Sequence, residues 1–174
     1  MKASSSSKQN VLLAVITILA TLFACELLLR WFAPIGDPFF SKNAPFISLT
    51  LYPDDRFLPH TTSPARFTTD EKGFRVSHAI NYARKPANVV RIFLIGGSTT
   101  EAWFIDDRNT FGYLLEQHLN QDLTKQGLEA EVINTARGGV ASADHYYVAH
   151  EVMRYDPDLV IYLMGINDMN PYLP

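Results

Sequence analysis

The stretch Val89-Val90-Arg91-Ile92-Phe93-Leu94-Ile95-Gly96-Gly97-Ser98 decides the fold. The residues before the two glycines form a short apolar run, rich in β-branched side chains and broken only by an arginine. Such a run, bounded by a glycine turn, is typical of a buried β-strand. We therefore predict a strand over residues 89–95 that ends in a turn carrying the hydroxyl of Ser98.

Two similar units follow along the chain. Residues 131–134 form a second such run, which is closed by Gly138 and Gly139, and residues 159–164 form a third, which ends at Gly165. Short apolar runs of this kind fit strands that are buried in a sheet. We predict three strands, each followed by a turn that contains glycine.

Helical patterns fill the two intervals between these strands. Apolar residues recur at helical spacing after Thr110, where Asn109 or Thr110 can cap a helix and Gly127 can end it. A second helix is predicted from Ser142 to Tyr155. Strands that alternate with helices at this spacing imply right-handed βαβ units and a parallel sheet, so the fold class is α/β.

The turns after the three strands carry groups that can do chemistry. Ligands of parallel sheets bind at the carboxyl ends of the strands, which is where Ser98, Gly139 and Asn167 fall. A serine nucleophile needs a tight turn that exposes its hydroxyl, and an oxyanion needs amide donors nearby. Taken singly, each residue also fits a structural role: a helix cap for Ser98, a loop glycine for Gly139 and an Asx turn for Asn167.

Three other glycine motifs are excluded. A phosphate-binding P-loop ends in Gly-Lys-Ser/Thr, which is absent here. The dinucleotide-binding fingerprint requires a third glycine where Glu101 and Ala102 stand. The nucleophile elbow of α/β-hydrolases requires glycine where Thr100 stands.

Considered together, the three turns resemble the conserved blocks of the SGNH (GDSL-type) hydrolase superfamily. Gly96-Gly97-Ser98-Thr99 matches its first block, and residues 134–139 are similar to its second, with Gly139 at the functional glycine. Gly165-Ile166-Asn167-Asp168 matches its third block. Gly73-Phe74-Arg75 also resembles a lead-in of membrane-anchored bacterial members, so the resemblance covers residues 69–169.

The resemblance implies a three-layer α/β sandwich with a parallel sheet, of which residues 89–174 would form the N-terminal part. It implies a serine hydrolase acting on acyl esters of carbohydrates or lipids, without metal or cofactor. Ser98 would attack the ester carbonyl, and the backbone amides of Ser98 and Gly139 with the Asn167 side chain would form the oxyanion hole. A polysaccharide O-acetyltransferase and a non-catalytic module that binds a glycan or a membrane partner remain alternatives.

The base of such a reaction is not evident in the sequence. In the family it comes from an Asp-x-x-His block after the third block, and no Asp-x-x-His occurs here. We expect His118 at the surface or at its boundary with the core, and we expect His145 or His150 to serve as base only with unusual geometry. The third strand would also present an uncovered apolar edge, which folded proteins generally avoid. We therefore expect a partial chain that is inactive by itself.

The N-terminal segment predicts a membrane anchor. Residues 1–10 are polar and should be cytoplasmic, whereas residues 11–33 are apolar apart from Glu26 and Arg30 and are long enough to cross a bilayer. The apolar run extends past any signal-peptide cleavage site, which favours an uncleaved anchor with the remaining chain in the bacterial periplasm or at the cell surface. A lipobox with a lipidated Cys25 and a buried core helix are the alternatives.

Residues 34–88 read as a proline-rich stalk and lead-in. Six prolines between Pro34 and Pro64 disfavour a long helix or a central strand, so we expect an extended segment that partly packs on the domain. The net charge of -3, without a basic cluster, excludes a typical nucleic-acid binder. The single cysteine, Cys25, excludes an intrachain disulfide and a cysteine-based metal site.

Overall fold

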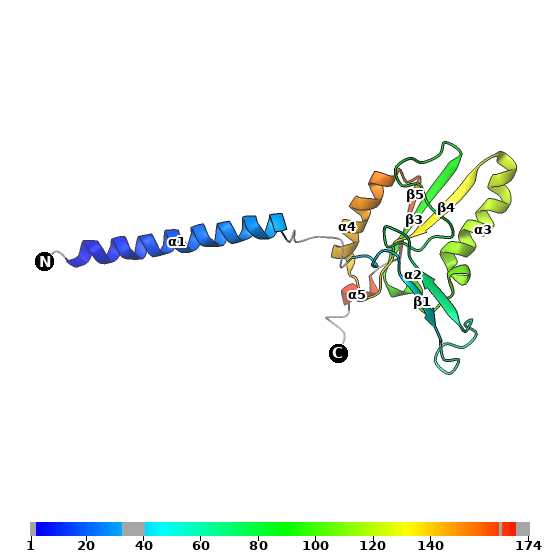
Figure 1. The fold of residues 1–174 in the computed structure, drawn as a ribbon, viewed down its shortest axis with the longest axis horizontal. Helices are drawn as coiled ribbons and strands as arrows, with labels where there is room; N and C mark the ends of the chain where they lie inside the picture. Colours follow the sequence, from blue (N-terminus) through cyan, green and yellow to red (C-terminus); the bar gives the residue numbers. More distant parts are fainter. Residues whose placement is uncertain (1–2, 33–40, 164, 170–174) are drawn as a thin grey trace. The chain divides into compact units, whose positions relative to one another are not determined.

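A computed structural model describes residues 3–32, 41–163 and 165–169 (Figure 1). The chain divides into two compact units, Met1–Asp37 and Pro38–Pro174. The former is the first unit and the latter the second unit.

The first unit contains one helix, α1 (Ala3–Phe32). Its segment Gln9–Leu28 has a mean hydropathy of 2.6 and is long and apolar enough to cross a membrane. The hydroxyls of Thr17 and Thr21 donate to carbonyl oxygens one turn earlier, each at 2.9 Å, so the helix itself satisfies these polar groups. None of this apolar window is buried within the described residues, whereas a core helix would be mostly buried.

The second unit is built on a three-stranded parallel sheet (Figure 1). Its strands are β3 (Val89–Gly96), β4 (Glu129–Asn134) and β5 (Leu159–Leu163), in the spatial order β4-β3-β5. Ile92 pairs with Val132 on one side and with Leu159 on the other. The predicted parallel sheet is confirmed, with strand bounds within two residues of those expected from the sequence.

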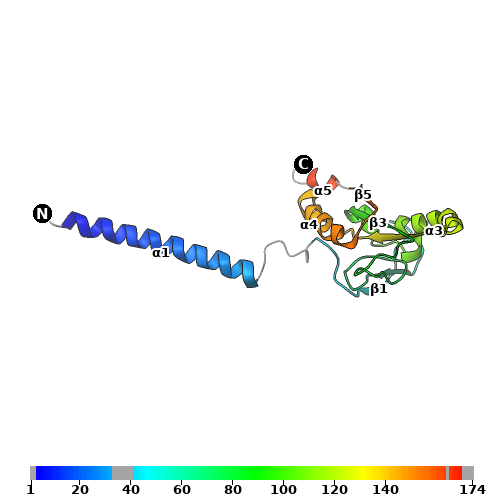
Figure 2. The ribbon, with the colours of Figure 1, turned by 90° about the horizontal axis from the view of Figure 1, so that it is seen from above.

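Helices cover the two faces of this sheet, which confirms a layered α/β arrangement. Figures 1 and 2 show α3 (Phe111–Leu123) and α4 (Ser142–Val152) on opposite sides of the strands. One core cluster joins Phe93, Ile95 and Ile133 of the sheet to Val148 and Val152 of α4. A second cluster joins the other face of the sheet to Leu115 and Leu119 of α3.

Both ends of α3 and the start of α4 lie where the sequence places them, whereas α4 ends at Val152 and is followed by a 3₁₀ turn, η4 (Met153–Tyr155), up to the predicted end. The Thr110 hydroxyl accepts from the amide of Tyr113 at 3.3 Å and so caps α3. After α3 the chain forms a short 3₁₀ turn, η3 (Thr124–Gln126). This helical segment ends at Gly127, which has a φ of 74°. At the start of α4, the carboxylate of Asp144 accepts from the amide of Ala141 at 2.9 Å.

The segment 34–88 packs partly on the domain, as expected, but it also contains a hairpin that its composition does not predict. Its described part contains an antiparallel hairpin of β1 (Ser48–Leu51) and β2 (Ala65–Thr68). Phe67 of β2, and Phe74 and Tyr82 after it, are buried. Pro45, Pro53, Pro59 and Pro64 lie outside both strands and leave the ladder intact, while the three buried aromatic side chains supply burial that the proline count does not reveal.

A charged pair lies inside the sheet near the amino ends of the strands. Arg91 of β3 is fully buried, and its Nε donates to Glu131 of β4 at 2.7 Å. Its other guanidinium nitrogens donate to the carbonyl oxygens of Tyr155 at 2.9 Å and Asn81 at 3.1 Å. Pairing and hydrogen bonding together make the burial of such a charge tolerable.

The edge strand β5 exposes apolar side chains. It pairs with β3 on one side only, and the exposed fractions of Leu159 and Leu163 are 49% and 52%. The expectation of an uncovered apolar edge is therefore confirmed for the part of the chain that is described.

Candidate functional site

A pocket of about 150 Å³ lies at the carboxyl ends of β3 and β5. These ends meet because Gly96 of β3 is the register partner of Leu163 of β5. The pocket is lined by Gly97, Ser98, Thr99, Val140, His145, Leu163, Gly165 and Asn167. Two of the three site residues predicted from the sequence, Ser98 and Asn167, thus share one pocket.

Ser98 opens a short helix, α2 (Ser98–Glu101), directly after β3. The change from strand to helix within two residues requires glycine at Gly96, because a Cβ there would lie 2.1 Å from Oγ1 of Thr100 and 2.6 Å from the Leu163 carbonyl oxygen. The side chain of Ser98 is exposed, and within the described residues its hydroxyl makes no hydrogen bond. The tight turn therefore presents a hydroxyl without a protein partner to the pocket.

Asn167 connects the turn after β3 to the loop after β4. It lies on α5 (Ile166–Met169), and its Nδ2 donates to the carbonyl oxygen of Val140 at 2.7 Å. A Cβ on Gly97 would come within 3.0 Å of the same nitrogen, so the amide sits directly beside the Ser98 turn. Since a side-chain amide has two N–H donors, one donor remains after the bond to Val140.

Gly139 lies next to the pocket without lining it. Its φ of 80° is a left-handed conformation that favours glycine, and it is exposed in the turn between β4 and α4. The following residue, Val140, forms part of the pocket wall. The structure therefore brings Gly139 to within one residue of the Ser98 pocket, and its role as an amide donor stays a prediction.

Glu101 links the two turns and was not identified from the sequence. It is buried at the end of α2, and its Oε2 accepts from the amide of Gly138 at 2.9 Å. Burial raises the pKa of this carboxyl, while hydrogen bonds from Asn43 and Gly138 act in the opposite direction. The Gly138-Gly139 turn is thus held to α2 by a side chain three residues after Ser98.

Arg75 of the lead-in Gly73-Phe74-Arg75 has a structural role at the end of α2. Its guanidinium donates to the carbonyl oxygens of Glu101 at 2.7 Å, Ala102 at 2.8 Å and Ile105 at 2.9 Å. It also pairs with Asp107 at 2.6 Å. These bonds satisfy carbonyl groups at the end of α2, where Ala102 adopts a left-handed φ of 55°, and so they fix the helix that begins with Ser98.

His145 is the second residue that sequence reasoning did not place in the site. Its side chain lines the pocket and is only 3% exposed. Desolvation lowers the pKa of His145, although the charges of Asp144 and Asp168 oppose this shift, so the neutral imidazole is favoured. The sequence could have indicated the burial of His145, because His145, Val148 and Val152 stand at positions i, i+3 and i+7 and so share one helix face.

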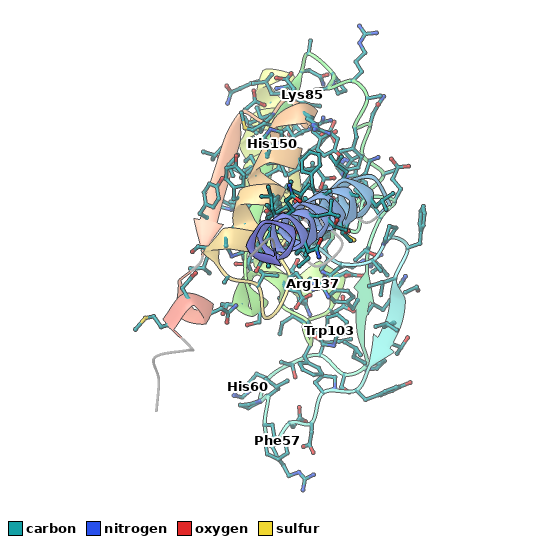
Figure 3. The ribbon with its side chains drawn as sticks, turned by 90° about the vertical axis from the view of Figure 1, so that its left-hand side faces the viewer. Phe57, His60, Lys85, Trp103, Arg137 and His150 are labelled. Carbon is teal, nitrogen blue, oxygen red and sulfur yellow. The ribbon has the colours of Figure 1, made fainter. Side chains whose placement is uncertain are left out.

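The remaining histidines lie away from the pocket. His60, His78, His118 and His150 are exposed and do not line it. Figure 3 shows His150 and His60 at opposite ends of the second unit. The prediction that His118 lies at the surface is confirmed.

Among the described residues, no group of three or more His, Cys, Asp or Glu side chains could hold a metal ion. The chain matches no protein-family model and no curated protein sequence. The functional assignment therefore rests on the motifs and on the geometry of the pocket.

Proposed function

We propose that this protein is a membrane-anchored serine hydrolase of the SGNH type that acts on acyl esters of carbohydrates or lipids. The observation that carries the proposal is the common pocket of Ser98 and Asn167 at the carboxyl ends of two parallel strands. Parallel sheets bind ligands at this edge, and the two residues occupy the positions of the first and third family blocks.

In the proposed reaction the Ser98 oxygen attacks the ester carbonyl and releases the alcohol, and water then hydrolyses the acyl-serine. The charge that develops on the carbonyl oxygen is stabilised by the remaining Asn167 donor and by the backbone amides of Ser98 and Gly139. Each preorganised donor of this kind contributes about 10²–10³-fold in kcat. Glu101 and Arg75 act by positioning, since they hold the turns that carry these groups.

His145 is the candidate base within the described part of the chain. It is the histidine that lines the pocket with Ser98, and its neutral form can accept a proton. The family resemblance instead implies a histidine from an Asp-x-x-His block. Replacement of His145 decides between these two sources without affecting the assignment of Ser98.

We place the second unit outside the cytoplasm, held to the membrane by α1. The support is the apolar segment Gln9–Leu28 and the resemblance to anchored bacterial proteins. Protease treatment of intact spheroplasts tests this: an external second unit is digested, whereas a cytoplasmic one is protected until the membrane is lysed.

The decisive experiment is labelling with a fluorophosphonate, which reacts with activated serines, in membranes of the source organism. We expect the wild-type protein to be labelled at Ser98, with labelling abolished in Ser98→Ala and retained in Ser48→Ala, which removes an exposed hydroxyl on β1. Absence of labelling in the wild type would favour the non-catalytic module. Addition of a glycan acceptor then separates hydrolysis from acetyl transfer, because only a transferase acylates the acceptor.

The same assay tests the base. We expect His145→Ala to slow labelling by about 10²–10⁴-fold, the usual contribution of general base catalysis. His150→Ala is the matched control, because His150 lies on the same helix and is exposed. Unchanged labelling of His145→Ala would assign the base to an Asp-x-x-His block.

A further inference from the structure

A second pocket of about 280 Å³ lies between the hairpin and the start of α3. It shares no lining residue with the Ser98 pocket. Its wall includes Arg66 and Thr68 of β2, Asp106 and Arg108 at the short helix η2 (Asp107–Asn109), and Tyr113 of α3. Three separate elements thus converge on one mostly polar cavity.

The carboxylates at this pocket are satisfied by the protein itself. Asp106 accepts from the backbone amides of Arg66 at 2.9 Å and Arg108 at 3.1 Å. Asp107 pairs with Arg75 at 2.6 Å and accepts from the Thr68 hydroxyl at 2.7 Å. Both acids therefore serve to join the hairpin to η2, and neither needs a ligand.

The two arginine side chains are in the opposite situation. Within the described residues the guanidinium groups of Arg66 and Arg108 form no ion pair and no hydrogen bond, and both residues are exposed. Partial burial opposes the ionisation of Asp106, but the amides and charges of these two arginines hold the pKa of its carboxyl below the usual range. The two arginines and two aspartates that line the pocket balance in charge, and Arg75, which pairs with Asp107 from outside the lining, leaves one positive charge over among these five groups.

The unpaired groups define the chemistry of a ligand. A guanidinium binds a carboxylate through two parallel hydrogen bonds, and two guanidiniums can share one carboxylate. Tyr113 adds an aromatic ring and a phenol that has no hydrogen-bond partner among the described residues. The cavity is close to the lower end of the roughly 300–1,000 Å³ range of small-molecule sites, which suits one monosaccharide unit.

We propose that this pocket binds an acidic sugar residue, with Arg66 and Arg108 on its carboxylate and Tyr113 against its ring. The polar wall favours a sugar over a lipid chain. The proposal does not depend on catalysis by Ser98, since the two pockets are separate and the test measures binding.

Equilibrium dialysis of the full chain in detergent micelles against labelled trigalacturonate tests the proposal. We expect saturable binding that weakens about tenfold for each arginine lost in Arg66→Gln and Arg108→Gln, as for hydrogen bonds to charged groups. The fully methyl-esterified trisaccharide, which lacks the charge, should bind at least about tenfold more weakly. Arg84→Gln, an exposed arginine outside the pocket, should bind like the wild type.

Three outcomes would overturn the proposal. They are no binding of trigalacturonate by the folded wild type, equal binding of the methyl ester, and competition by inorganic phosphate as strong as by the trisaccharide itself, which would indicate a simple anion site. Circular dichroism of each variant confirms that lost affinity does not reflect lost folding, and Tyr113→Phe, which keeps the ring, should retain most of the binding.

Discussion

Polar groups at the two ends of the three-stranded sheet differ in whether the protein gives them hydrogen-bonding partners. At the amino end, charged groups pair with one another: Arg91 pairs with Glu131, and Asp158 accepts from the Arg91 amide at 2.7 Å and from Lys85 at 2.8 Å. At the carboxyl end, Ser98 has no hydrogen-bond partner among the described residues and Asn167 uses only one of its two donors.

Under the proposed function, the amino end of the sheet stabilises the fold and the carboxyl end carries the reaction. A polar group at a pocket that the protein itself leaves without a partner is available to a ligand. The amino end should therefore respond to substitution mainly in stability, and the carboxyl end mainly in activity.

Breaking the amino-end pair should have the largest effect. Arg91→Met leaves Glu131 as a buried, unpaired carboxylate, which we expect to lower the free energy of unfolding by about 3–5 kcal/mol. Urea unfolding measures the change, and the double variant Arg91→Met/Glu131→Leu should recover most of the loss because it removes both charges. A single variant as stable as the wild type would contradict the role of this pair.

Removing the Asn167 amide should leave stability nearly unchanged while slowing the reaction. Asn167→Ala loses the proposed oxyanion donor, so we expect ester turnover or fluorophosphonate labelling to fall by about 10²–10³-fold. The bond to Val140 is also lost, at a cost of about 1 kcal/mol in unfolding free energy. A variant that keeps full turnover would remove Asn167 from the oxyanion hole and weaken the contrast between the two ends.

The fold was largely predictable from local patterns. The apolar runs, Thr110 and Gly127 gave the strands and the helix ends, because strand burial and helix capping depend on nearby residues. The hairpin in the proline-rich stretch was missed, since its burial comes from contacts of Phe67 and Phe74 with distant parts of the chain.

The site was predictable only in part. Glycine turns after strands identified Ser98, Gly139 and Asn167, but the supporting residues Glu101 and Arg75 act on loops far away in sequence. Their partners are mostly backbone groups, which every residue type supplies, so the sequence does not show which residues they contact. His145 had such a signal, its place on the buried stripe of α4, yet sequence spacing alone could not show that it reaches the pocket.

A smaller effect is expected on the pH dependence of folding stability, to which His78 and His145 should contribute with opposite sign. A hydrogen bond that His78 donates to the Glu116 carboxylate raises the pKa of His78 above its ordinary value of 6.5, so its contribution to stability is complete below pH 6.5 and is lost as pH rises through the folded-state pKa. Desolvation lowers the pKa of His145, so its contribution has the opposite sign: it is present above pH 6.5 and is lost as pH falls through the lowered value.

Melting temperatures measured from about pH 5.5 to about pH 8.5 should therefore change in opposite directions in the two variants, because this range spans the ordinary histidine pKa. His78→Ala should lose most stability relative to the wild type at the acidic end, and His145→Ala should be relatively more stable there than at the alkaline end. His118→Ala, which removes an exposed imidazole on the same helix as Glu116, is the control and should show no slope. Parallel slopes for His78→Ala and His145→Ala would mean that the two environments do not differ as their contacts imply.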